Sequence, residues 1–250
     1  MPVWCQDEAG PYQAIPQPGA SWQPEGRPAL RPSEYIRGGT AKLLTLFPPK
    51  TGEVRAKGVE QSTNAVLHPW LKEGLSAILE ALPEVKDPSA PGRRWTDWGW
   101  PEETVKVWWP ERTPPPVRLA LIWDNLKGHH SPEIVSWCWS RGIALLYTPL
   151  GGSWLNLAES VQRILVRRAL DGQDLGTPEA VIQQLEATAR GWNREPTPFE
   201  WGGKRRDRRQ RARERRHILP ASGGYTLKPV LRRSRPSPYE RVVNASFHAN

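Results

Sequence analysis

Apolar residues form short unbroken runs in two parts of the chain. Residues 119–123 are five apolar residues in a row, and residues 143–147 form a second run of this kind. A strand without polar alternation is typical of the buried centre of a sheet. Residues 41–47 and 53–60 flank a Pro/Gly turn and predict a hairpin.

Helical spacing of apolar residues predicts four helices between and after these strands. They cover residues 64–82, residues 132–141, residues 153–170 and a segment that opens at Thr177. Ser131 and Ser153 are the expected N-caps of the second and third helices, because a serine oxygen accepts bonds from free backbone N–H groups. Pro69 leaves open where the first helix begins, because proline disrupts a helix interior.

The order of these elements predicts an α/β fold. A short strand over residues 3–6 precedes the hairpin, and a helix, strand, helix, strand and helix follow it. This order describes a mixed sheet with helices on both faces, and a ribonuclease-H-like fold fits it. The two apolar strands are expected to pair in parallel through a right-handed crossover. Residues 83–116 form a Pro/Trp-rich insertion in a domain expected to span residues 1–198, and residues 199–250 form a basic C-terminal extension.

Positive charge is concentrated near the C-terminus. The net charge of the 250 residues is +9, and residues 204–216 alone carry nine Lys or Arg and a net charge of +7. A solvated tail would explain this segment, but contact with nucleic-acid phosphates is the favoured interpretation. The expected DNA contacts in the segment are Lys204, Arg205, Arg206, Arg208, Arg209 and Arg211.

Cysteine content and hydropathy bear on where the protein works. Cys5 and Cys138 are too few for a disulfide scaffold, which favours a reducing compartment. The sequence shows neither a signal peptide nor a run of 18 apolar residues. We therefore expect a cytoplasmic, nucleoid-associated protein without a membrane partner.

Three acidic residues stand at positions where a sheet edge could collect them. Asp7 follows the first apolar run, Asp124 ends a buried strand, and Glu159 lies 34 residues further on, near a helix start. Asp124 alone could be a turn former, and Glu159 alone could be favoured by the helix dipole. For Asp7, the adjacent Glu8 could take the same role in the site. Together they could hold two divalent cations, which cut and rejoin phosphodiesters.

Polar residues beside these acids fit a nucleic-acid site. Asn125 and Asn156 could orient a carboxylate or a water molecule. Lys127 could reach a phosphate, and Arg163 and Arg167 follow Glu159 by one and two helical turns and could hold DNA.

Aromatic residues near the site and in the insertion have structural explanations. His129 and His130 are expected to form structural or substrate hydrogen bonds rather than to bind metal, because adjacent side chains in an extended segment point apart. The tryptophans between Trp95 and Trp109 are expected to pack in a core or an interface rather than to stack on bases. Trp4 and Trp123 are expected to wall the site.

Long stretches of the chain resemble the bacterial insertion-sequence transposases of the mariner-like superfamily of Asp-Asp-Glu transposases. Residues 6–10, 122–129 and 147–160 resemble the catalytic blocks of that family, and the spacing of 34 residues is the family's own. Residues 192–194 and 199–216 resemble its C-terminal stretch.

The resemblance implies a reaction and its partners. Asp7, Asp124 and Glu159 would be the catalytic metal ligands for two Mg²⁺ (or Mn²⁺) ions, an assignment that fits hard oxygen donors. The expected substrate is double-stranded DNA, both transposon ends and target, and the expected reactions are strand hydrolysis and transfer of the 3′ end into the target. A homodimer on DNA is the family-level expectation.

The sequence departs from the family at its N-terminus. Full-length relatives carry helix-turn-helix domains before the catalytic domain, and this sequence begins a few residues before Asp7. A separate or frameshift-fused helix-turn-helix region, or a truncated remnant, would account for the difference. A related metal-dependent nuclease or resolvase and an inactive DNA-binding remnant therefore stay open as alternatives.

Overall fold

The computed structural model describes residues 1–19, 24–27, 30, 34–99, 114–149, 152 and 155–199. Residues Met1–Glu200 form one compact unit, and every described element belongs to it. The boundary expected at residue 198 stays a prediction, since residues 201–250 lie outside the described part of the chain.

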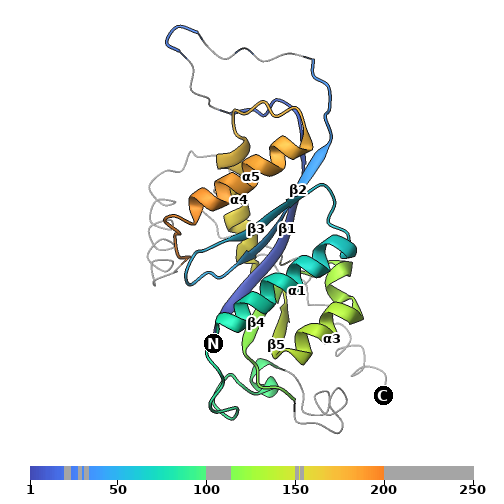
Figure 1. The fold of residues 1–250 in the computed structure, drawn as a ribbon, viewed down its shortest axis with the longest axis vertical. Helices are drawn as coiled ribbons and strands as arrows, with labels where there is room; N and C mark the ends of the chain where they lie inside the picture. The colour runs from blue at the N-terminus through green and yellow to red at the C-terminus, as the bar shows by residue number, and fades with distance from the viewer. Residues whose placement is uncertain are drawn as a thin grey trace, which may run out of the picture. The chain divides into compact units, whose positions relative to one another are not determined.

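A five-stranded mixed sheet forms the centre of this unit (Figure 1). Its strands are β1 (Val3–Gln13), β2 (Thr40–Phe47), β3 (Arg55–Val59), β4 (Leu119–Trp123) and β5 (Ile143–Tyr147). The spatial order is β3-β2-β1-β4-β5; the first three strands pair antiparallel, and β1, β4 and β5 pair parallel. The predicted hairpin and the predicted parallel pair are therefore confirmed, and the fold is ribonuclease-H-like.

Two helices cover each face of the sheet. The helices are α1 (Asn64–Ala81), α3 (Pro132–Ser140), α4 (Leu157–Leu170) and α5 (Pro178–Trp192). Apolar residues of α1 and α3 share one buried core with β4, and those of α4 and α5 share another with β1 and β2. Side chains on a strand point alternately to the two faces, so each core takes every second residue of β1 and β2.

The first strand is longer than predicted. The sequence predicts a strand only over residues 3–6, because Gly10 and Pro11 are typical of a loop. In the structure β1 continues to Gln13, and its register against β2 shifts between Ala9 and Tyr12. Gly10 has a φ of 117°, so the shift falls where glycine permits it. Asp7 consequently lies within a strand rather than at its end.

Helix starts differ from the sequence prediction in two places. Helix α4 begins at Leu157, and the side chain of Asn156 caps it by accepting a bond from the N–H of Ala158. The predicted cap, Ser153, lies outside the described residues. Ser131 occupies the N-cap position of α3 as predicted, but its side chain forms no capping bond.

The remaining helix predictions agree with the structure. Helix α1 accommodates Pro69 in its interior and begins at Asn64, as the apolar spacing alone predicts. Thr177 caps α5 by accepting a bond from the N–H of Ala180. Among the described residues, no helix combines the length and apolar character that a membrane span requires.

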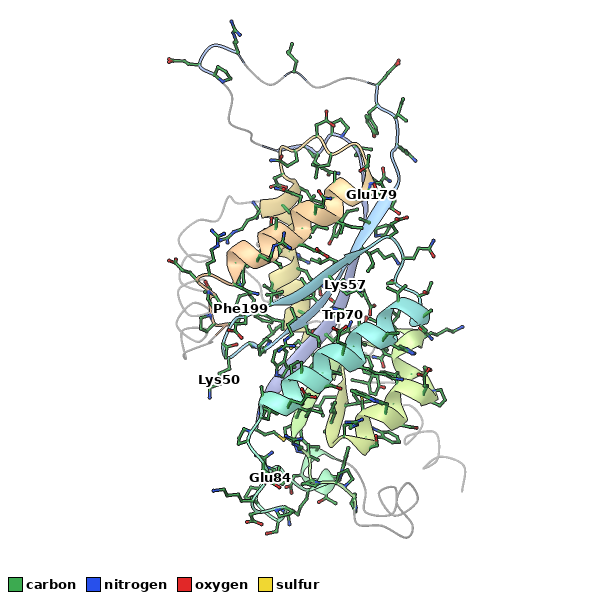
Figure 2. All side chains as sticks on the ribbon, viewed as in Figure 1. Lys50, Lys57, Trp70, Glu84, Glu179 and Phe199 are labelled. Atoms are coloured by element: carbon green, nitrogen blue, oxygen red, sulfur yellow. The ribbon has the colours of Figure 1, made fainter. Side chains whose placement is uncertain are left out.

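The described part of the Trp-rich insertion packs against the sheet. A short 3-10 helix, η1 (Trp95–Trp98), buries Trp95 in the core beneath α1, and the indole N–H of Trp95 donates to the carbonyl of Pro115 at 2.9 Å. Packing is therefore confirmed for Trp95, while residues 100–113 lie outside the described residues. Near residue 200, Phe199 packs against Phe47 at a ring-centroid distance of 4.9 Å, and Figure 2 shows it beside the β2–β3 turn that carries Lys50.

Candidate functional site

Asp7 lies on β1, and Asp124 directly follows β4, the parallel strand beside it. Cys5 of β1 pairs with Ile122 of β4. Asp7 comes two residues after Cys5, and Asp124 comes two residues after Ile122. Neighbouring strands are roughly 4.8 Å apart. Asp7 therefore lies on the face on which Cys5 contacts the core beneath α4 and α5, whereas the carboxylate of Asp124, just past the end of β4, contacts His129.

The first turn of α4 lies over this part of β1. The amide of Asn156 donates to the carbonyl of Gln6 at 2.6 Å, and Leu157 and Ala158 pack in the same core as Cys5. Glu159 is the next residue along this turn, so the packing of α4 delivers it to the face that carries Asp7. Asp7, Asp124 and Glu159, far apart in sequence, are thus carried by elements that pack next to one another.

The electrostatics of Asp7 reflect its burial and the acids near it. Its pKa is raised to about 7, first by burial and then by the negative charges of Asp124, Glu8 and Glu159. A carboxylate repelled by its neighbours is stabilised by any cation that they share. The charge distribution therefore favours a bound cation among these acids.

The carboxylates of Asp124 and Glu159 already have cationic partners. Asp124 Oδ1 lies 2.6 Å from His129 Nδ1, and Glu159 Oε1 lies 2.9 Å from a guanidinium nitrogen of Arg163. Within the described ranges, no group of three His, Cys, Asp or Glu side chains is arranged to hold a metal ion. The metal-ligand assignment of Asp7, Asp124 and Glu159 accordingly stays a prediction.

Glu8 is separated from Asp7 by the alternation of the strand. It lies on the opposite face, where its carboxylate accepts a bond from Gln6 at 3.0 Å and lies 3.0 Å from His129 Nε2. Of the two acids, only Asp7 shares the face of Cys5, and the choice between Asp7 and Glu8 as a metal ligand stays a prediction.

His129 forms a buried bridge that the sequence does not reveal. It lies in the 3-10 turn η2 (Lys127–His130), is 0% exposed, and joins Asp124 to Glu8 through its two ring nitrogens. Burial is the largest influence on its pKa and lowers it, but the bonds to Asp124 and Glu8 together raise the pKa to about 9. The bond from His129 is in turn the main cause that lowers the pKa of Asp124. Structural hydrogen bonding, the favoured interpretation for this residue, is confirmed.

Several neighbours have structural contacts that were not expected. The amide of Asn125 donates to the carbonyl of Thr148 at 2.5 Å and so holds the loop after β4. Asn156 caps α4 and binds β1 through backbone groups. Trp123 is fully buried in the core beneath α1 and α3, and Trp4 belongs to the same core. Asn125 and Asn156 therefore hold backbone segments next to the site, and Trp4 and Trp123 pack in the core instead of walling the site as predicted.

The basic residues expected to contact DNA are exposed where the structure describes them. Lys127 is exposed in η2, three residues after Asp124. Arg163 and Arg167 are exposed on α4, and Arg167 lies 3.8 Å from Asp171. Lys204, Arg205, Arg206, Arg208, Arg209 and Arg211 lie outside the described residues.

Removing the Asn156 side chain tests how α4 is fixed to the sheet. Asn156→Ala should lower the free energy of unfolding by about 2 kcal/mol, because it removes a helix cap and a buried bond to Gln6. Thr177→Ala, which removes only a cap, should cost about 1 kcal/mol. Urea unfolding of both variants makes the comparison, and equal losses would show that the bond to β1 contributes nothing.

The raised pKa of Asp7 predicts a pH dependence of stability in metal-free protein. The folded protein holds this proton up to about pH 7, whereas the unfolded chain releases it near the ordinary value of 3.8. The contribution of Asp7 to the free energy of unfolding is therefore fully present below pH 3.8, the pKa in the unfolded chain, and is lost as the pH rises to about 7. Asp7→Asn should consequently gain stability relative to wild type between pH 4 and pH 7, as measured by urea unfolding in a chelator. A difference that does not change with pH would contradict the shift.

Comparison with known families covers the central part of this site. Residues 107–182 match the family model described as DDE superfamily endonuclease. The matched span contains Asp124 and Glu159 with the turn η2 and the helix α4, whereas Asp7 and the basic segment lie outside it. No curated protein matches the chain. The segment that carries two of the three acids is therefore similar to the DDE superfamily endonucleases.

Proposed function

We propose that this chain carries the catalytic domain of a DNA transposase of the mariner-like, bacterial insertion-sequence type. It would hydrolyse phosphodiesters at transposon ends and transfer the 3′ end into target DNA. One observation carries the proposal: Asp124 follows the strand that pairs in parallel with the strand of Asp7, and α4, which carries Glu159 in its first turn, is bonded to β1 at Gln6. The similarity of residues 107–182 to DDE superfamily endonucleases supports the same reaction class.

The residues at this site fit Mg²⁺ or Mn²⁺ as the cofactor. Asp7, Asp124 and Glu159 offer only carboxylate oxygens, the donors that hard divalent cations prefer. Burial and then the negative charges of the neighbouring acids raise the pKa of Asp7, and a shared cation would relieve that repulsion. When bound by these acids, two such ions would activate a water or a DNA 3′-hydroxyl and stabilise the leaving oxygen.

The surrounding residues would position the DNA. Lys127 and Arg167 are exposed cations close in sequence to the acids and would contact phosphates. Arg163 is paired with Glu159, so it could exchange that carboxylate for a DNA phosphate. Six basic residues between Lys204 and Arg211 would add contacts that do not depend on DNA sequence. Action as a homodimer on DNA belongs to the same proposal.

A cleavage-and-joining assay with the purified full chain tests this function. Labelled duplex DNA would be incubated with Mg²⁺, with Mn²⁺ and with a chelator, and both nicks and joined products would be resolved on a denaturing gel. Metal-dependent nicking together with joining is the expected result. Nicking without joining would favour a nuclease, and salt-sensitive binding without nicking would favour an inactive DNA-binding remnant.

A further inference from the structure

A buried histidine stands directly behind the acid on β4. His129 has no exposed surface and lies between two carboxylates that come from different strands. We propose that His129 is a positioning residue: its Nδ1 fixes the carboxylate of Asp124, and Glu8 fixes the ring through Nε2. This inference rests on the proposed function, because it gives Asp124 the role of a metal ligand.

The two carboxylate oxygens of Asp124 differ in their contacts. Oδ1 accepts from His129 Nδ1 at 2.6 Å and from the backbone N–H of Leu126 at 3.1 Å. Among the described residues no donor contacts Oδ2, which leaves that oxygen for a ligand. Two donors on one oxygen fix the plane of a carboxylate, and carboxylates that bind metals are commonly held by such outer partners.

The other end of the ring is anchored to β1. His129 Nε2 lies 3.0 Å from Glu8 Oε1, and the same oxygen accepts from Gln6 Nε2 at 3.0 Å. The indole N–H of Trp123 donates to Gln6 Oε1, so β4 and β1 are joined a second time behind the site. Glu8 is only 8% exposed and is therefore committed to this network.

Packing fixes the remaining freedom of the ring. The imidazole stacks on Trp123 with a centroid distance of 4.3 Å and an interplanar angle of 23°. The hydroxyl of Tyr147 donates to the carbonyl of His129 at 2.8 Å, and His68 lies 3.3 Å from the carbonyl of Gly128 in the same turn. A ring held at both nitrogens, on one face and through its backbone can impose one orientation on Asp124.

Two substitutions separate the contacts of the ring. In His129→Asn the side-chain amide nitrogen replaces Nδ1 and can still donate to Asp124, whereas in His129→Gln it replaces Nε2 and can reach only Glu8. We expect the Asn variant to bind Mn²⁺ within about threefold of wild type and the Gln variant to bind it about 10–100-fold more weakly. Free Mn²⁺ would be measured by electron paramagnetic resonance, with circular dichroism to establish that each variant is folded.

Glu8 provides a second pair of variants that leaves the ring intact. Glu8→Gln and Glu8→Ala remove the same charge, but only Gln keeps an acceptor for His129 Nε2. The Ala variant should bind Mn²⁺ at least about threefold more weakly than the Gln variant, because it no longer holds the His129 ring that positions Asp124. Glu53→Gln and Glu53→Ala, at an exposed glutamate in the β2–β3 turn, form the matched control pair and should bind Mn²⁺ equally.

The outcomes distinguish the positioning role from the proposed function. If wild type binds Mn²⁺ but the two His129 variants bind it equally, the positioning role is overturned and the function stands. The positioning role is also overturned if the two Glu8 variants bind Mn²⁺ equally. If wild type binds no Mn²⁺ and cuts no DNA, the proposed function fails and the positioning role falls with it.

Discussion

Asp124→Asn should lower the rate of Mg²⁺-dependent DNA cleavage by on the order of 10³-fold or more, because an amide cannot supply the charge that holds a divalent cation. The fold should survive the change. Asn has the size of Asp, and its amide oxygen can still accept the bonds that Asp124 receives from His129 and Leu126. Affinity for DNA should change by less than about twofold, since most of it comes from phosphate contacts elsewhere.

The comparison requires an acid outside the cluster as its control. Asp171 follows the last residue of α4, is 51% exposed, and pairs with Arg167 at 3.8 Å. Asp171→Asn should cleave DNA at the wild-type rate, and gel-shift titrations should show that both variants bind DNA. Undiminished cleavage by Asp124→Asn in Mg²⁺ would contradict the assignment of this acid.

The central strands could be predicted because their sequences carry the whole signal. Residues 119–123 and 143–147 are apolar throughout, and a strand of this kind is stable mainly at the centre of a sheet, where both of its faces are buried. Their bounds in the structure are those the pattern predicts. The same holds for α5, where Thr177 and Pro178 mark the start.

Elements that depend on distant partners were predicted less well. Nothing within residues 7–13 indicates a strand, because Gly10 and Pro11 oppose one locally. Pairing with β2 over Thr40 to Phe47 nevertheless extends β1 to Gln13. Likewise, Asn156 begins α4 in part because its amide bonds Gln6, 150 residues away in sequence. Such tertiary bonds override local preference and leave no mark in the local pattern.

The candidate site divides in the same way. Asp7, Asp124 and Glu159 can be selected from their places relative to apolar runs and from the resemblance to known transposases. The bridge from Glu8 through His129 cannot, because 121 residues separate Glu8 from His129. A partial signal exists: on a strand, adjacent residues point to opposite faces, so Asp7 and Glu8 could not both face α4. That rule shows that only one of the two acids faces α4, but it does not identify His129 as the partner of Glu8.

Replacing six basic residues near the C-terminus should have the largest effect on DNA affinity. The change is Lys204, Arg205, Arg206, Arg208, Arg209 and Arg211 to Gln. Removing one phosphate-binding cation should reduce the slope of log affinity against log salt by about 0.9, so the slope should fall by up to about 5. At low salt we expect affinity for duplex DNA to drop by about 10³-fold, measured by fluorescence anisotropy over a salt series.

A control for total charge decides whether the segment acts as a site. Lys50, Lys57 and Lys86 are exposed lysines elsewhere on the chain, and Figure 2 labels the first two. Changing these three to Gln should alter the slope by much less per charge than changing the six. An equal effect per charge would mean that the segment contributes only to the net charge of the protein. If the six-residue variant keeps the wild-type cleavage rate at saturating DNA, binding and chemistry reside in different parts of the chain, because the acids on the sheet and α4 are unchanged.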